Sequence, residues 1–211
     1  MKTILFQGDS ITDCSRNRES APNMPAHLGY GYPNLVSAQL LYEHAEDMYR
    51  CINKGVSGNR VVDLYARWKI DALNFSPDLI SILIGVNDVW HEANKNGVES
   101  DRFEQVYRML LEWTKKVLPE VKLIIMEPFA LPSDVVTDEF LPEVKIRAAI
   151  AKKLAEEFDA VFLPLQEKLE AAAKRNGNNS YWLWDGVHPT PAGHRLIADA
   201  WLEAAKPLLK D

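Results

Sequence analysis

The chain has 211 residues, of which 47% are hydrophobic and 26% charged, and its formal net charge is −6 at pH 7. This length suits one α/β domain with a substantial core, and the composition argues against a disordered chain. The acidic balance and the absence of a Lys- or Arg-rich run exclude proteins that bind nucleic acid or anionic membranes through a basic patch.

Strand-like apolar runs alternate with helix-like patterns along the whole chain. In chain order we predict a strand at 2–6, a helix at 33–45, a strand at 48–52, a helix at 60–72, a strand at 78–84, a loop at 87–99, a helix at 100–117, a strand at 121–126, a helix at 140–158, a strand at 160–163, a helix at 164–175, a loop at 176–190 and a helix at 191–208. This order predicts an α/β fold with three α/β/α layers, in which helices cover both faces of a five-stranded parallel sheet. We expect a flavodoxin-like strand order of 2-1-3-4-5 and one domain spanning residues 1–211, because no linker or repeat divides the chain.

No stretch approaches the roughly 20 apolar residues that a membrane helix needs, and the apolar run after Met1 is too short for a signal-peptide core. The cysteines are Cys14 and Cys51, which are too few for a disulfide framework. We therefore expect a cytoplasmic protein with no membrane partner and no nucleic-acid partner.

The segment Gly-Asp-Ser at 8–10 follows directly after the first predicted strand. In open α/β sheets, ligands lie beyond the carboxyl ends of the strands, at the switch point beside the first strand. Ser10 is therefore well placed to present its hydroxyl to a ligand, and its backbone N–H can point into the same site. Taken alone, Gly-Asp-Ser is more often a plain turn or a helix cap.

The segment Asp-Gly-Val-His-Pro at 185–189 lies in the last predicted loop. A serine nucleophile needs a base to accept its proton, and the base needs a carboxylate to orient it. In a tight turn, Asp185 can reach the Nδ1–H of His188 and leave Nε2 free to face Ser10. An isolated Asp-x-x-His is more often a capped turn with an exposed histidine.

Two glycine-containing loops follow the second and third predicted strands. Gly-Val-Ser-Gly at 55–58 offers the Gly58 N–H, and Gly-Val-Asn-Asp at 85–88 offers the Asn87 amide, as donors to a developing oxyanion. The Ser10 N–H would be a third donor. Each loop alone is compatible with ordinary turn hydrogen bonds, and the first lacks the Lys-Ser/Thr of a phosphate-binding loop.

All four motifs fall after predicted strand ends or in the last loop, on one edge of one sheet. In the order Gly-Asp-Ser, Gly-x-x-Gly, Gly-x-Asn-Asp and Asp-x-x-His, they resemble the SGNH hydrolase superfamily, also called GDSL esterases, over essentially the whole chain. The resemblance implies an SGNH hydrolase fold, Ser10 as nucleophile and Asp185 and His188 as its triad partners. It also implies an oxyanion hole made by Ser10, Gly58 and Asn87.

Longer strings resemble the intracellular bacterial acetylxylan esterases of this superfamily, namely Gly-Asp-Ser-Ile-Thr-Asp-Cys at 8–14, Asn-Lys-Gly-Val-Ser-Gly-Asn at 53–59 and Ile-Gly-Val-Asn-Asp-Val-Trp at 84–90. This resemblance implies a homo-oligomer that removes acetyl groups from xylo-oligosaccharides through an acyl-enzyme, with no metal or other cofactor. Asp9, Trp90 and Trp184 are expected to bind substrate. Aromatic faces can stack on sugar rings, and packing around the site would explain the two tryptophans equally well.

Three alternatives stay open. A short-chain lipid esterase, a lysophospholipase or a thioesterase would use the same triad. A metal-dependent deacetylase would need a ligand set such as Asp9, Asp88, Asp185 and His188, although the sequence has no His-Glu-x-x-His motif. A sugar-binding module would keep the shape of the site without catalysis.

The remaining histidines offer weaker candidates. His91 lies near Asn87 and is a rival base, but no carboxylate stands in a comparable turn with it. The other three are expected to be surface or helix-packing residues: His27, His44 and His194. Cys14, four residues after Ser10, is a candidate for the pocket wall.

Overall fold

The computed structural model describes residues 2–209, and its centre is a parallel sheet. The strands are β1 (Thr3–Gly8), β2 (Arg50–Asn53), β3 (Leu79–Leu83), β4 (Lys122–Met126) and β5 (Val161–Leu163). They lie in the order β2-β1-β3-β4-β5, and every neighbouring pair is parallel. The predicted sheet and its strand order are confirmed. The central strands β1 and β3 are mostly apolar and are buried along their length because helices cover both faces of the sheet.

The longer helices lie close to their predicted bounds. They are α3 (Tyr32–Glu43), α4 (Val61–Asp71), α6 (Ser100–Val117), α7 (Phe140–Glu157), α8 (Gln166–Asn176) and α9 (Pro191–Leu209). Shorter elements are α1 (Ser10–Asp13), α2 (Pro25–Leu28), α5 (Val86–Trp90) and the 3₁₀ turns η1 (Ala45–Asp47), η2 (Leu73–Phe75) and η3 (His91–Asn94). The predicted loop at 87–99 is wrong over its first half, which is helical, because elements of one or two turns are too short to show an apolar period.

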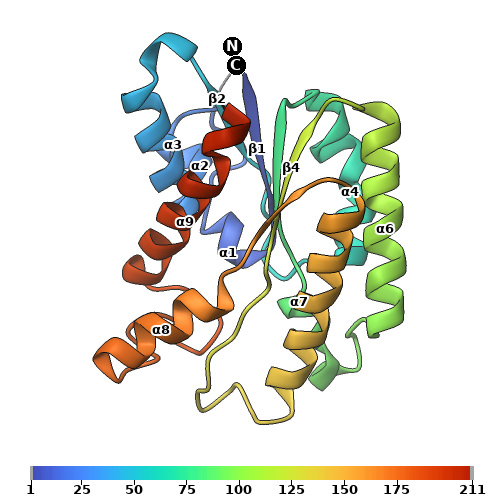
Figure 1. Ribbon diagram of the computed structural model, residues 1–211, viewed down its shortest axis with the longest axis vertical. Helices are drawn as coiled ribbons and strands as arrows, with labels where there is room; N and C mark the ends of the chain where they lie inside the picture. The colour runs from blue at the N-terminus through green and yellow to red at the C-terminus, as the bar shows by residue number, and fades with distance from the viewer. Residues whose placement is uncertain (1, 210–211) are drawn as a thin grey trace.

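The helices form one layer on each face of the sheet (Figure 1). α3 and α9 pack together on one face, and α4, α6 and α7 cover the other. Trp201 of α9 is fully buried, and its Nε1–H donates to Ser81 Oγ on β3 (2.8 Å). Trp68 of α4 is also fully buried, and its Nε1–H donates to Thr114 Oγ1 on α6 (2.8 Å). Each indole therefore buries a large apolar surface while its one polar group is satisfied.

The strand order reverses at the centre of the sheet, between β1 and β3. The chain leaves β1 towards β2 on one side and leaves β3 towards β4 on the other, so the connecting segments diverge and leave a crevice at the carboxyl ends. Ser10 follows β1, the loop at 54–60 follows β2, and α5 follows β3. Three of the four sequence motifs therefore meet at this edge.

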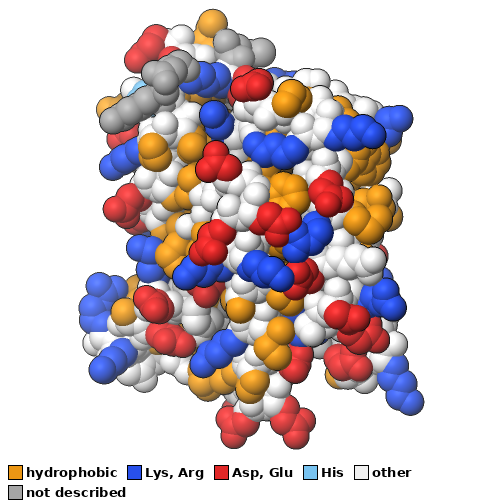
Figure 2. All heavy atoms as spheres, turned by 45° about the vertical axis from the view of Figure 1, so that its right-hand side comes forward, with side chains coloured by type: hydrophobic (Ala, Val, Ile, Leu, Met, Phe, Trp, Pro, Cys, Tyr) orange, Lys and Arg blue, Asp and Glu red, His pale blue; other side chains and the backbone are white. Residues whose placement is uncertain are grey.

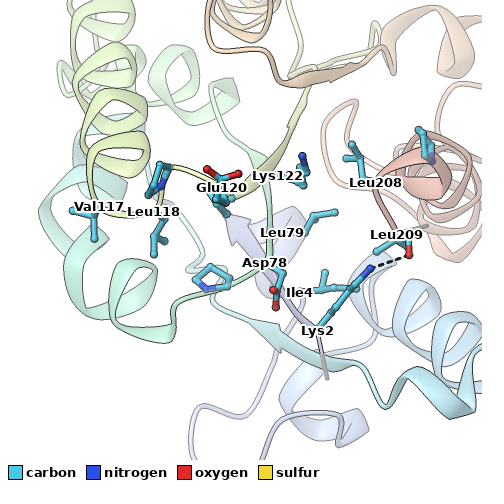
Figure 3. Close-up of a pocket in the computed structure, with 14 residues that line it drawn as sticks. Lys2, Ile4, Asp78, Leu79, Val117, Leu118, Glu120, Lys122, Leu208 and Leu209 are labelled. Atoms are coloured by element: carbon cyan, nitrogen blue, oxygen red, sulfur yellow. Dashed lines mark hydrogen bonds between the residues drawn. The ribbon is translucent and has the colours of Figure 1, made fainter. Parts of the chain in front are cut away.

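A hollow of about 490 Å³ lies at the opposite edge of the sheet (Figure 3). Ile4, Leu79 and Lys122 line it at the amino ends of their strands, and Lys2 Nζ donates to the Leu209 carbonyl at its margin (3.2 Å). It is larger than the hollow beside the β1–α1 turn, which measures about 210 Å³. The placement of reactive groups, rather than size, therefore identifies the candidate site.

Acidic and basic side chains are interspersed on the face of the molecule shown in Figure 2. This distribution gives nucleic acid no continuous basic surface on that face. Among the helices of residues 2–209, none has the length and apolar character needed to cross a membrane.

Candidate active site

Ser10 lies in the turn between β1 and α1, and the residue before it sets its position. Asp9 is the N-cap of α1, and its Oδ1 accepts a hydrogen bond from the Ile11 N–H (3.0 Å). This cap makes Ser10 the first residue of the helix, where it lines the hollow at the sheet edge. The Ser10 Oγ lies 2.9 Å from Nε2 of His188, although the two residues are 178 positions apart in the sequence.

Asp185 holds His188 through both of its carboxylate oxygens. Oδ2 lies 2.7 Å from Nδ1 of His188, and Oδ1 accepts the backbone N–H groups of Val187 (3.0 Å) and His188 (2.7 Å). Burial opposes ionisation of Asp185, but these hydrogen bonds outweigh it, and the pKa of the carboxyl falls below its usual value. Because the ionised carboxylate can only accept, Nδ1 of His188 carries the proton and Nε2 is left to accept from the Ser10 hydroxyl.

The loop after β4 holds the 185–188 turn in place. Ser133 Oγ–H donates to the Asp185 carbonyl (2.6 Å), and the Leu131 N–H donates to the Gly186 carbonyl (2.8 Å). Gly186 has a φ of +88°, and a Cβ at this position would lie 2.5 Å from the Leu131 carbonyl oxygen. Glycine is therefore the residue that fits, because the turn combines a left-handed backbone with close contact to a neighbouring chain segment.

The three predicted oxyanion donors lie on the segments that follow β1, β2 and β3. In the part of the chain that the structure describes, the N–H groups of Ser10 and Gly58 have no hydrogen-bond acceptor, so both are available to a ligand. Asn87 is 8% exposed, and its Nδ2 donates to the Asn59 carbonyl (3.1 Å). An amide nitrogen carries two hydrogens, so one remains for a ligand. The combined role of these donors as an oxyanion hole stays a prediction.

Two tryptophans flank His188 in different ways. The Trp184 ring stacks on the imidazole at an angle of 23°, with centroids 5.7 Å apart, and the Trp184 side chain is 63% exposed. Trp90 meets the same imidazole edge-on at 6.3 Å and packs edge-on against Phe140. Trp184 therefore keeps a face that a ligand can reach, whereas the contacts of Trp90 are those of a residue that packs behind the site.

The sequence predicts only some of the residues that line the hollow beside Ser10. Its lining residues are Ser10, Ile11, Cys14, Ser15, Tyr30, Ser57, Trp184, His188, Pro189 and His194. Cys14 was expected here. The sequence predicts His194 on the surface or in helix packing, whereas its place in the wall depends on how α9 meets Cys14 and the start of α3, a tertiary contact that no local motif signals.

Cys14 and His194 form a neutral pair in this wall. The Cys14 Sγ lies 3.4 Å from Nε2 of His194, whose Nδ1 accepts the Tyr32 N–H (3.1 Å). Burial raises the pKa of the Cys14 thiol to about 11 and lowers the pKa of His194 to about 4. The thiol is therefore protonated at neutral pH, which makes Cys14 a poor nucleophile beside Ser10.

Asp9 does not have the position that we expected of a substrate-binding residue. It is fully buried, and its Oδ2 has no hydrogen-bond partner among the described residues. Burial raises the pKa of this carboxyl to about 7, and it raises the pKa of buried Asp88 to a similar value. A substrate in the hollow cannot reach Asp9, so the contribution of Asp9 to the site is the cap that places Ser10.

The alternative set of metal ligands is not brought together. Asp9 and Asp88 are buried, and both oxygens of Asp185 are engaged by the turn and by His188. Across residues 2–209, no group of three or more His, Cys, Asp and Glu side chains is arranged to hold a metal ion. Instead, a serine, a histidine and an aspartate at this edge are connected by hydrogen bonds.

Comparison with known sequences places this arrangement in a family. Residues 6–196 match the model of the GDSL-like lipase/acylhydrolase family. The chain is 37% identical over 205 residues to an acetylxylan esterase from Geobacillus stearothermophilus, and the match covers 94% of this chain and 91% of that protein.

Solved structures show the same fold. A protein from Parabacteroides merdae described as a GDSL-like lipase has 41% identity and a TM-score of 0.93, and the match covers 97% of this chain and 95% of that one. Axe2, an acetylxylan esterase from Geobacillus stearothermophilus, has 34% identity and a TM-score of 0.88, with 100% and 95% covered. Catalytic mutants of Axe2, in which a serine, an aspartate or a histidine is replaced by alanine, superpose similarly. The chain therefore belongs to the GDSL-like lipase/acylhydrolase family and is a carboxylic ester hydrolase.

Proposed function

We propose that this hydrolase is a serine esterase that removes acetyl groups from xylo-oligosaccharides or related acetylated sugars through an acyl-enzyme. The observation that carries the proposal is the relay from Ser10 Oγ to His188 Nε2 (2.9 Å) and from His188 Nδ1 to Asp185 Oδ2 (2.7 Å). A hydroxyl on a base that a carboxylate orients is the arrangement required of a serine nucleophile.

In the proposed reaction, Ser10 Oγ attacks the ester carbonyl carbon while His188 Nε2 accepts the hydroxyl proton. Asp185 stabilises the imidazolium that forms. The N–H groups of Ser10 and Gly58 and the Asn87 amide donate to the developing oxyanion. The tetrahedral intermediate collapses as the bond from carbon to the sugar oxygen breaks and His188 protonates that oxygen, which leaves as a sugar hydroxyl. A water molecule, deprotonated by the same imidazole, then attacks the acetyl-Ser10 ester and releases acetic acid.

The surroundings of Ser10 support a sugar as the alcohol part of the substrate. Trp184 and Tyr30 line the hollow and are 63% and 71% exposed, so both offer aromatic faces on which a sugar ring can stack. Axe2 is described as an acetyl-xylooligosaccharide esterase, and this chain is similar to it over its whole length. The replaced aspartate and histidine of the Axe2 catalytic mutants are three positions apart, as are Asp185 and His188.

A second candidate is a short-chain lipid esterase or a thioesterase with the same triad. It is favoured by the similarity to the Parabacteroides merdae protein, which is described as a GDSL-like lipase. The hollow beside Ser10 measures about 210 Å³, which suits a short acyl chain better than a long one.

The test is acetate release from acetylated xylo-oligosaccharides, measured beside hydrolysis of p-nitrophenyl acetate and p-nitrophenyl octanoate, each with wild type and Ser10→Ala. Strong turnover of the acetylated sugars that is lost in Ser10→Ala supports the proposal. Turnover of the nitrophenyl esters alone, octanoate above all, supports the second candidate. Unchanged turnover in a folded Ser10→Ala protein would overturn the assignment of the nucleophile.

Two further features form part of the proposal. The free thiols Cys14 and Cys51 are compatible with a reducing cytoplasmic location. Assembly into a homo-oligomer is expected from the resemblance to the acetylxylan esterases.

A further inference from the structure

The segment that follows β3 holds the loop that carries Gly58. Two consecutive side chains of α5 bind this loop just beyond the glycine. Asn87 Nδ2 donates to the Asn59 carbonyl (3.1 Å), and the Asp88 carboxylate accepts the Val61 N–H at 3.1 and 3.3 Å. Both side chains are at least nine-tenths buried, so these bonds are shielded from water. They fix the point at which the loop enters α4.

His91, at the end of α5, makes a third contact to the same loop. Its Nε2 lies 3.1 Å from the carbonyl oxygen of Gly58. A carbonyl oxygen can only accept, so Nε2 of His91 carries a proton and donates it. This nitrogen is therefore engaged with Gly58 and is not free to act as a base on Ser10.

Gly58 has little else to fix it. It is exposed, its φ is +81°, and a Cβ built on it would have one neighbour within 4 Å, Nε2 of His91 at 3.9 Å. A glycine without packing contacts moves over a wide range of backbone angles. Its orientation therefore depends on the hydrogen bonds that the neighbouring backbone makes.

Hydrogen bonds hold the backbone just before and just after this glycine. Before the glycine, Asp13 Oδ2 accepts the Ser57 N–H (2.9 Å). After the glycine, His91 holds the Gly58 carbonyl. The Gly58 N–H lies between these two anchors and has no acceptor of its own among the described residues. The Asn59 N–H also donates to the Val56 carbonyl (3.1 Å), which keeps the turn, so loss of the His91 contact loosens the backbone that aims the Gly58 N–H.

We infer that His91 is a positioning residue, which aims the Gly58 N–H at the oxyanion through its hydrogen bond to the Gly58 carbonyl. This inference rests on the proposed function, because the oxyanion forms only if Ser10 attacks an ester. His91 acts through Gly58 and does not touch the substrate. Its removal should weaken stabilisation of the transition state and leave ground-state binding of the ester largely unchanged.

The first readout is the change in kcat and the change in KM, determined separately with p-nitrophenyl acetate as substrate. His91→Ala should lower kcat by roughly 10- to 100-fold, the size expected when a reacting group is misplaced by about 1 Å, with little change in KM. His91→Gln should recover most of kcat, because the Gln side-chain amide can donate from about the place of Nε2. His44→Ala is the matched control, since His44 is also part-exposed and its Nδ1 lies beside Asp47 Oδ2 (3.7 Å), at the end of α3 and outside the lining of the hollow.

The second readout is binding of phenylboronic acid, in which Ser10 Oγ adds to boron and the proton passes to His188. The boronate oxygen mimics the oxyanion, so affinity should fall in His91→Ala in parallel with kcat and recover in His91→Gln. Thermal melts check that all variants are folded.

Three results would overturn the inference: kcat and boronate affinity of His91→Ala equal to wild type, an equal loss in His91→Ala and His91→Gln, or a change confined to KM. Retention of activity in Ser10→Ala would instead overturn the proposed function, so the two failures are distinguishable.

Discussion

Asp185 sets the tautomer of His188, and the substitution Asp185→Asn tests this without removing the turn. An Asn side chain keeps an oxygen for the N–H groups of Val187 and His188, but its amide would donate to Nδ1. The imidazole proton would then sit on Nε2, which could no longer accept from Ser10. We expect kcat to fall by about 10⁴-fold, while the melting temperature stays within a few degrees of that of wild type. A fall of less than tenfold in p-nitrophenyl acetate hydrolysis would contradict this role.

Asp9 should make stability depend on pH. Burial raises its pKa to about 7, so between about pH 4 and pH 7 the folded chain keeps a proton that the unfolded chain has lost. The free energy of unfolding therefore falls as pH rises through this window, by at most about 1.4 kcal/mol per pH unit. Asp9→Asn keeps the cap on Ile11 but cannot ionise, so its melting temperature relative to wild type should rise from pH 4.5 to pH 7.5. A difference that is independent of pH would show that Asp9 is ionised in the folded chain.

A buried polar contact joins helices α4 and α6. Thr114 Oγ1 accepts the Trp68 Nε1–H (2.8 Å), and both side chains are fully buried. Thr114→Val keeps the shape of the side chain but leaves the indole N–H unpaired, at a cost of about 1–3 kcal/mol. Thermal unfolding should shift down by several degrees, while kcat stays as in wild type because neither residue lines the crevice. If Thr114→Val were as stable as wild type, a water molecule would have to accept the Trp68 Nε1–H in place of the Thr114 hydroxyl.

Elements long enough to show a period were predictable from the sequence. The helix predicted at 100–117 is α6, with the same bounds, because its apolar residues recur on one face. The four residues of α1 and the five of α5 were missed because their helical form comes from a cap and a strand end rather than from periodicity. These short helices carry Ser10 and Asn87, so the local geometry of the site was the less predictable part.

Across the molecule, the resemblance implies that Ser10 and the 185–188 turn meet although most of the chain separates them, and in the structure Ser10 Oγ contacts His188 Nε2. The contributions of His194 and His91 to the site could not be predicted in the same way. Each depends on which backbone group of a distant segment its ring meets, namely the N–H of Tyr32 at the start of α3 and the carbonyl of Gly58. No local pattern of residue types encodes such a contact.

The hollow beside Ser10 is lined by two exposed aromatic side chains, Tyr30 (71% exposed) and Trp184 (63% exposed). Apolar surface of this kind is typical of sites that contact a ligand or another subunit. We expect a homo-oligomer, so light scattering coupled to size-exclusion chromatography should give a mass that is a multiple of the chain mass. A single-chain mass at assay concentration would contradict this expectation. Substrate binding would then be the remaining role for these aromatic side chains.

If Ser10 attacks the ester, it should also carry the covalent adduct of a reagent that reacts as the ester does. A p-nitrophenyl phosphonate ester should release one p-nitrophenolate per active site and leave a stable phosphonyl group, because its tetrahedral adduct resembles the transition state. We predict that peptide mapping finds this group on Ser10, and that Ser10→Ala gives neither release nor adduct. An adduct on nearby Cys14, or none while wild type still hydrolyses esters, would contradict the account.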